Sequence, residues 1–212
     1  MKSYDETKQK LKDMAKLSYQ KALFAGTSGN LSMYDPESKI MAITPSSIAY
    51  EILEAEDMVL MTLDGEIIEG KNRPSSEWRM HASIYKNRPE IKAVIHTHSP
   101  YATSFAVNGE IIPIILIEMI PFIGGEVPLA KFALPGSEEM GLEALKVLDE
   151  SQACLLANHG VLAIGENLDQ THLRAIYVED AAKIYSLAKS NGSVQLVPEE
   201  FVIAMKEKRN RR

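Results

Sequence analysis

Two histidines separated by one residue, His96 and His98, could hold a metal ion between them. They follow the apolar run Ala93-Val94-Ile95, which is typical of the end of a buried strand. Residues two apart in a strand point to the same face, with Cα atoms roughly 6.5 Å apart, so the two imidazoles would lie together. Such a pair can also be two histidines with structural roles, and the pair alone leaves both interpretations open.

A useful metal site needs a third ligand, and the candidate is His159. It stands at the glycine-containing corner Asn158-His159-Gly160, between the apolar runs 153–156 and 161–164. This third histidine favours metal binding, because strands on either side of the corner could bring it to the same end of the sheet.

Three short clusters of glycine, hydroxyl and amide residues could bind an anion. They are residues 26–30, Ser46-Ser47 and Ser75-Ser76. Glycine permits close approach of the backbone, and hydroxyls and free amides can donate hydrogen bonds. Ser75-Ser76 also precedes a predicted helix, whose N-terminus favours phosphate. Each cluster alone would be an ordinary turn or cap, but together with a metal pair they suggest a phosphate pocket.

Glu77 lies in the first turn of that predicted helix. On its own it would be a carboxylate that interacts with the helix dipole. Beside a metal ion it could be a fourth ligand or a general base. His81 lies one helical turn further on and could line the same site, but we expect it on the helix surface or in packing. We expect Trp78 in the core and His172, in the long helix, to be structural or at a subunit contact.

Strands and helices that alternate along the chain would position these residues. Beside the histidine strand, the pattern predicts strands over residues 31–34, 40–44, 58–63, 66–69, 111–117 and 153–164, and helices over 4–23, 73–87, 137–148, 167–190 and 197–208. Asp64-Gly65 is a strong hairpin signal, and hairpins argue against an all-parallel sheet. We therefore expect one α/β domain over residues 1–212, with a C-terminal tail from about residue 198.

Charge and composition exclude several classes of function. The chain has 212 residues and a net charge of −6, which argues against general nucleic-acid binding. The longest apolar run, 111–117, is too short to span a membrane, and residues 1–12 lack the apolar core of a signal peptide. The single cysteine, Cys154, fits a reducing compartment. We expect a cytoplasmic protein that binds neither nucleic acid nor membranes.

Five motifs occur along the chain: Gly26-Thr27-Ser28-Gly29-Asn30-Leu31-Ser32, Thr44-Pro45-Ser46-Ser47, Pro74-Ser75-Ser76-Glu77-Trp78, His96-Thr97-His98-Ser99 and Asn158-His159-Gly160. In this order and spacing, the chain resembles the class II aldolase/adducin family, most closely its L-fuculose-phosphate aldolase branch. The similarity extends over most of residues 5–190. Several linked motifs are far more specific than any one of them.

The resemblance implies one zinc ion per subunit, held by His96, His98 and His159, with Glu77 as catalytic base. It implies a set of phosphate-pocket residues: Asn30, Ser46, Ser47, Ser75 and Ser76 as contacts, with Thr27 and Gly29 shaping the pocket. It also implies a three-layer α/β/α fold with a largely antiparallel central sheet. The expected assembly is a homotetramer with active sites at subunit interfaces.

The implied chemistry is the cleavage of a phosphorylated ketose. Three neutral imidazoles leave zinc an open position, where carbonyl and hydroxyl oxygens of a ketose 1-phosphate could bind. The metal would stabilise the negative charge that develops when the C–C bond breaks, and a nearby carboxylate would move the proton. Mn²⁺ or Co²⁺ could occupy the same ligands, because affinity order alone does not fix the metal.

The sequence departs from the aldolase branch at two tyrosines. Where that branch has an acidic tyrosine after the apolar strand, the counterpart here, by spacing from Gly124-Gly125, is Glu118. A glutamate in this context is characteristic of the related methylthioribulose-phosphate dehydratases, which generally lack a carboxylate placed as Glu77 is. The family's C-terminal tyrosine is absent from residues 202–212. Glu118 is therefore a second candidate catalytic residue, or else an exposed carboxylate at a strand end.

Four functions remain open from the sequence. The first is a zinc-dependent aldolase that releases dihydroxyacetone phosphate and an aldehyde. The second is a sugar-phosphate 4-epimerase, which typically carries aspartate at the position of Glu77. The third is a methylthioribulose-1-phosphate dehydratase that uses Glu118. The fourth is a non-catalytic scaffold domain as in adducin, which the presence of the three histidines and Glu77 disfavours.

Overall fold

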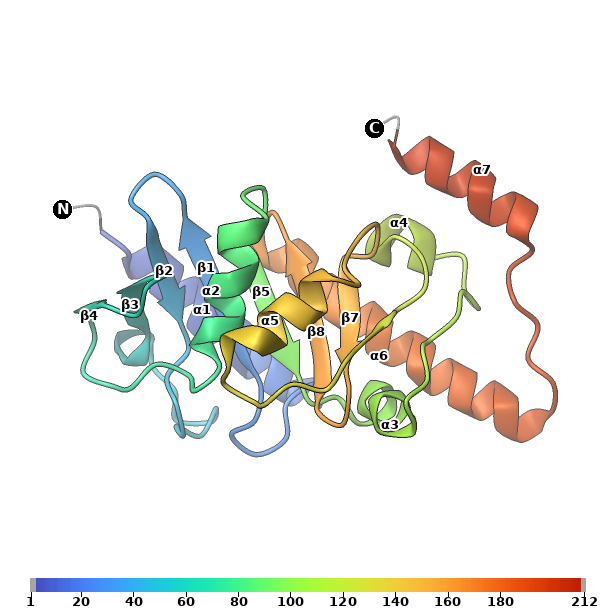
Figure 1. The fold of residues 1–212 in the computed structure, drawn as a ribbon. Helices are drawn as coiled ribbons and strands as arrows, with labels where there is room; N and C mark the ends of the chain where they lie inside the picture. The colour runs from blue at the N-terminus through green and yellow to red at the C-terminus, as the bar shows by residue number, and fades with distance from the viewer. Residues whose placement is uncertain (1–2, 211–212) are drawn as a thin grey trace.

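An eight-stranded sheet forms the centre of the computed structural model, which describes residues 3–210 (Figure 1). The strand order across the sheet is β4-β3-β2-β1-β5-β8-β7-β6. The strands are β1 (Asn30–Asp35), β2 (Ile40–Ile43), β3 (Val59–Thr62), β4 (Ile67–Glu69), β5 (Ala93–Thr97), β6 (Leu129–Ala130), β7 (Ala153–Leu156) and β8 (Gly160–Gly165). The first four confirm the strands predicted before residue 70, and β7 and β8 confirm the strand pair predicted over 153–164.

The sheet is mixed, which corrects the expectation of a largely antiparallel sheet. The neighbours from β4 to β7 pair antiparallel, but β6 and β7 pair parallel. In the sequence, helix α5 (Glu138–Leu145) connects these two strands. Parallel neighbours need such a crossover connection, whereas a hairpin joins antiparallel ones. The hairpin signals in the sequence therefore could not predict the parallel pairing of β6 with β7.

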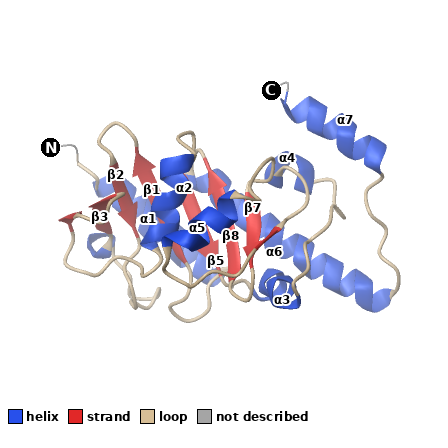
Figure 2. Cartoon of the chain, in the orientation of Figure 1, coloured by secondary structure: helices blue, strands red, loops and turns tan. Residues whose placement is uncertain are grey.

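Helices cover both faces of the sheet (Figures 1 and 2). In chain order the other helices are α1 (Asp5–Gln20), α2 (Trp78–Asn87), α3 (Pro100–Asn108), α4 (Met119–Ile123), α6 (Leu168–Asn191) and α7 (Glu199–Asn210), with a short 3-10 helix at Ala55–Asp57. Helices α2 and α5 pack on one face, and α1, α3, α4 and α6 contribute to the core on the other. Along β5, Ala93 and Ile95 face the second group, whereas Val94 faces the first. This alternation is the two-residue period of a strand.

The segment after α3 differs from the prediction. Residues 111–117 form no strand, and Ile112 alone makes an isolated bridge, to Val127. Pro113 has no N–H to donate to a ladder, and α4 starts only two residues after this segment ends. Helices α3 and α4 were not predicted.

The C-terminal tail is largely helical. The helix predicted over 197–208 is confirmed as α7, which contacts α4 and is drawn in red in Figure 1. Residues 1, 2, 211 and 212, at the ends of the predicted domain, lie outside the described residues. Within residues 3–210, no helix has the length and apolar character needed to cross a membrane.

Candidate active site

Three neighbouring strands bring the predicted histidines to one place. In the sheet, His96 of β5 pairs with Asn30 of β1 on one side and with Leu162 of β8 on the other. His98 follows two residues later, just beyond the end of β5. His159 lies in the tight turn between β7 and β8. That turn needs glycine at position 160, because a Cβ there would lie 2.2 Å from the Thr97 carbonyl oxygen.

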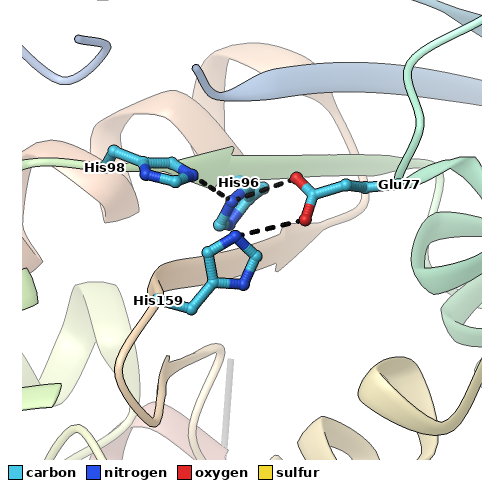
Figure 3. Close-up of side chains that lie close together, drawn as sticks. All are labelled: Glu77, His96, His98 and His159. Atoms are coloured by element: carbon cyan, nitrogen blue, oxygen red, sulfur yellow. Dashed lines mark hydrogen bonds and ion pairs between the residues drawn. The ribbon is translucent and has the colours of Figure 1, made fainter. Parts of the chain in front are cut away.

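The three imidazoles and the carboxylate of Glu77 converge in space (Figure 3). One ligand atom from each of the four residues lies within 4.8 Å of the others. The Nε2 atoms of His96 and His98 are 2.8 Å apart. The two carboxylate oxygens of Glu77 lie 3.2 Å from Nε2 of His96 and 3.2 Å from Nε2 of His159. The structure thus assembles the three predicted ligands with the predicted base.

The donor atoms suit a metal cation. His96 donates its Nδ1–H to the carbonyl of Val161 at 2.9 Å, which leaves the lone pair of Nε2 facing the cluster. Burial lowers the pKa of His96 to about 3 and also lowers that of His98, so both rings are neutral at neutral pH. Oε1 of Glu77 and Nδ1 of His159 are buried without a hydrogen-bond partner. Imidazole nitrogens and a carboxylate oxygen are the donor types of catalytic zinc sites.

Glu77 sits immediately before α2, not within its first turn. The predicted start at residue 73 was too early, because the Ser75 N–H donates to the Thr44 carbonyl and Pro74 bridges to Pro45. The side chain of Glu77 makes no capping hydrogen bond to the helix. Its carboxylate instead faces His96 and His159. The structure therefore places Glu77 with the histidines and not in the helix-dipole interaction that was the alternative interpretation.

The carboxylate of Glu77 is buried but ionised. Burial raises its pKa, but the nearby His96 and His159 and a hydrogen bond from Asn30 lower it more, so the net shift is downward. The Asn30 Nδ2–H donates to Oε2 at 2.8 Å. A buried, ionised carboxylate beside imidazoles is a suitable ligand or proton acceptor.

The predicted phosphate residues line one pocket of about 290 Å³ beside the cluster. All seven are there: Thr27, Gly29, Asn30, Ser46, Ser47, Ser75 and Ser76. Glu77, His98 and His159 line the same pocket. The backbone at Gly29 has a φ of 88°, and a Cβ there would lie 2.3 Å from the ring of Phe24. Sequence clusters far apart in the chain therefore meet in one polar cavity.

Glu118 is not part of this cavity within one chain. It is exposed at the residue before α4 and does not line the pocket. It follows residues 111–117, which were predicted as a strand but form none, so it is not a strand-end carboxylate either. Its proposed catalytic role therefore depends on something outside the single chain.

His81 lies closer to the site than the sequence predicted, because it contacts Asn30, which lines the pocket. It is fully buried, not on the helix surface, and its Nε2 lies 2.6 Å from Oδ1 of Asn30. Its position four residues after Glu77 was the available signal, because residues one turn apart share a helix face. Trp78, expected in the core, is partly buried at its edge, with the Arg79 guanidinium 4.6 Å from its ring centre. His172 is buried, as a structural role requires.

Comparisons with known proteins agree with this geometry. Residues 9–186 match the family described as class II aldolase and adducin N-terminal domain. The chain belongs to this family. An L-fuculose 1-phosphate aldolase structure superposes with a TM-score of 0.91 at 40% identity, covering 98% of this chain and 97% of that one.

Curated members of the family carry more than one activity in their names. The 5-deoxy-D-ribulose 1-phosphate aldolase of Bacillus thuringiensis serovar kurstaki is 39% identical over 178 residues, covering 84% of this chain and 83% of that protein. The L-ribulose-5-phosphate 4-epimerase of Salmonella paratyphi B is 31% identical over 175 residues, covering 77% and 76%. Family membership together with the aldolase-named relatives supports a metal-dependent aldolase, which is a carbon–carbon lyase.

Proposed function

We propose that this class II family member is a zinc-dependent aldolase, which cleaves a ketose 1-phosphate to dihydroxyacetone phosphate and an aldehyde. The observation that carries this proposal is the convergence of Glu77 with His96, His98 and His159 at the wall of a hydroxyl-rich pocket. Cleavage of a C–C bond needs a cation near the substrate oxygens, a group that moves a proton and a site for phosphate. All three requirements have candidate residues within one cavity.

The three histidines would hold one zinc ion per subunit, and that ion would supply a Lewis acid at the substrate oxygens. Glu77 would move the proton at the carbon that becomes the nucleophile. Asn30, Ser46, Ser47, Ser75 and Ser76 would bind the phosphate, with Thr27 and Gly29 shaping the pocket. Position and ionisation support Glu77 in this role, because its carboxylate is held between Asn30 and two imidazoles.

Two substrates are favoured by the names of the similar proteins. L-fuculose 1-phosphate and 5-deoxyribulose 1-phosphate both carry a methyl group at the end opposite the phosphate. Cleavage between C3 and C4 gives dihydroxyacetone phosphate from each, with lactaldehyde from the first and acetaldehyde from the second. We propose a substrate of this class, a deoxyketose 1-phosphate.

The assembly proposed for this enzyme is a cytoplasmic homotetramer of single-domain, three-layer α/β/α subunits. Helices on both faces of the sheet support the layered description. Exposed apolar side chains on one stretch of the chain support subunit contacts, among them Ile111, Ile117, Phe132 and Leu134. Active sites at the interfaces would bring Glu118 of one subunit toward the pocket of another.

The test is a panel of ketose phosphates incubated with the zinc-loaded protein, with dihydroxyacetone phosphate measured by coupled reduction. We expect release from deoxyketose 1-phosphates, none after chelation, and little from the unphosphorylated sugars. Loss of water from methylthioribulose 1-phosphate without dihydroxyacetone phosphate would instead show a dehydratase. Inversion at C4 of a pentulose 5-phosphate without cleavage would show the 4-epimerase, the second candidate, which one relative's name supports. Retention of the fold with no bound metal and no turnover would indicate an adducin-like scaffold.

A further inference from the structure

A buried row of polar side chains runs from Glu77 away from the pocket into the space between β1 and α2. The Asn30 amide N–H donates to Glu77 at 2.8 Å, and Asn30 Oδ1 lies 2.6 Å from Nε2 of His81. Nδ1 of His81 lies 2.7 Å from Oγ of Ser32, which lies 2.7 Å from the hydroxyl of Tyr85. The row links five residues from two stretches of the sequence, residues 30–32 and 77–85.

The secondary structure explains why these side chains meet. Asn30 and Ser32 are two apart on β1, so they point to the same face of the sheet. His81 and Tyr85 are four apart on α2, so they share the helix face that packs against it. All four are buried, and none except Asn30 lines the pocket. His81, Ser32 and Tyr85 therefore act on a substrate only through Asn30 and Glu77.

The orientation of the Asn30 carboxamide fixes the direction of the next hydrogen bonds in the row. The Asn30 Nδ2–H donates to Oε2 of Glu77, so the carbonyl oxygen of Asn30 faces His81. That oxygen only accepts, so His81 must carry its proton on Nε2. Burial lowers the pKa of His81 to about 4, so the ring is neutral and Nδ1 has a free lone pair. Ser32 must then donate to Nδ1, which leaves its oxygen to accept from the Tyr85 hydroxyl, whose proton also lies within reach of the Ser32 carbonyl oxygen at 3.0 Å.

We propose that His81 is a positioning residue, which holds the Asn30 carboxamide with its N–H toward Glu77, and that Ser32 and Tyr85 select the Nε2–H form of His81. If the amide turned over, its oxygen would face the Glu77 carboxylate and repel it. The row thereby keeps the carboxylate aimed at the metal ligands. This proposal rests on the proposed function, in which Glu77 moves the substrate proton.

Two substitutions of His81 separate positioning from packing. His81→Gln keeps an N–H donor for Asn30, whereas His81→Leu fills similar space without one. We expect His81→Leu to lower kcat for cleavage about 10- to 100-fold with a smaller change in KM, and His81→Gln to recover most of the loss. Zinc content should be unchanged in both, because the three histidine ligands remain.

The matched control is Ser83→Ala, on the same helix between His81 and Tyr85. The Ser83 hydroxyl is buried and makes no hydrogen bond, so its loss should leave kcat and KM unchanged. Tyr85→Phe removes only the far end of the row and should lower kcat about threefold. Equal kcat values in His81→Gln and His81→Leu would overturn the proposal, as would a rise in KM with kcat intact.

Neutron diffraction of the wild-type protein tests the row without any turnover. We expect deuterium on Nε2 of His81 and none on Nδ1, with the Asn30 amide deuterons toward Glu77. Deuterium on Nδ1, or on both nitrogens, would contradict the proposal even where a His81 variant fails to fold. If no ketose phosphate is cleaved, the proposed function fails, whereas this measurement still decides the arrangement of the row.

Discussion

Two glutamates lie in contrasting regions of the molecule. Glu77 is buried between β1 and the histidine cluster, where Asn30, His96 and His159 surround its carboxylate. Glu118 is exposed at the start of α4, beside the exposed Ile117. The first carboxylate has polar partners from two strands and a turn, whereas the second lies on the surface beside an exposed apolar side chain.

This difference shows that the surroundings of a glutamate, and not its residue type alone, determine whether its carboxylate can take part in catalysis. Burial and fixed partners give Glu77 one orientation and keep it next to the metal ligands. Glu118 has no such surroundings within residues 3–210 of one chain. It could serve the reaction only if a second copy of the chain placed it there, and the exposed Ile117 next to it is suited to such a contact.

Loss of the metal should have the largest effect on the Glu77 region. We expect about one zinc per chain, lost in His96→Ala, His98→Ala and His159→Ala, because two remaining imidazoles hold the ion poorly. Activity should fall to background in each variant and on chelation. Elemental analysis with kinetics checks this, and His172→Ala, outside the cluster, is the control. Full metal content and normal turnover in one of the three variants would remove that residue from the site.

Glu77→Gln should come next. The substitution keeps the shape of the side chain and removes the proton acceptor, so we expect kcat to fall about 10²- to 10⁴-fold with zinc retained. Steady-state kinetics beside metal analysis checks this. A variant that keeps wild-type kcat would show that Glu77 is not the base.

The pocket hydroxyls should have a smaller effect, mainly on binding. Ser75→Ala should raise KM for the phosphorylated substrate about tenfold with less change in kcat, because phosphate is held equally in the ground and transition states. Asn30→Ala should also lower kcat, since the Asn30 amide donates to Glu77. The two variants, compared on the same substrate, separate binding from orientation. Equal turnover of the unphosphorylated sugar would refute the pocket assignment.

Glu118→Gln should have the smallest effect, about tenfold or less in kcat, if Glu118 only orients the aldehyde end. This effect should require the tetramer, because Glu118 does not line the pocket of its own chain. Light scattering at the assay concentration checks the assembly. A fully active monomer would remove both the interface and the role of Glu118.

The sequence predicted that Glu77, the three histidines and the pocket residues would meet, because they lie in strands and turns whose period and composition carry the signal. The apolar runs placed His96 and His159 at strand ends, and the glycine at 160 marked the turn that unites them. The same logic failed at residues 111–117, where an apolar run mimics a strand although its side chains are partly exposed. The conformation of residues 111–117 depends on tertiary or subunit contacts, which the local sequence pattern does not show.

Helix α3, the parallel edge of the sheet and the contact of His81 differ in how far the sequence could predict them. Ser99-Pro100 begin α3 and Gly109 ends it, and both are standard signals of helix ends. The parallel edge at β6 could not be predicted, since a two-residue strand has too little pattern. The spacing of His81 from Glu77 could be read from the sequence, but its contact with Asn30 depends on the packing of α2 over β1, which is tertiary information.

The central claim is that Glu77 moves the proton at the carbon next to the metal site, and hydrogen exchange tests it most directly. Dihydroxyacetone phosphate alone would be incubated with the zinc-loaded enzyme in D₂O, so that the unknown aldehyde plays no part. We predict that the wild type and Glu118→Gln exchange one C3 hydrogen for deuterium at similar rates, followed by NMR. Glu77→Gln should exchange it about 10²- to 10⁴-fold more slowly. Exchange at the wild-type rate in Glu77→Gln, or its loss in Glu118→Gln alone, would contradict the account.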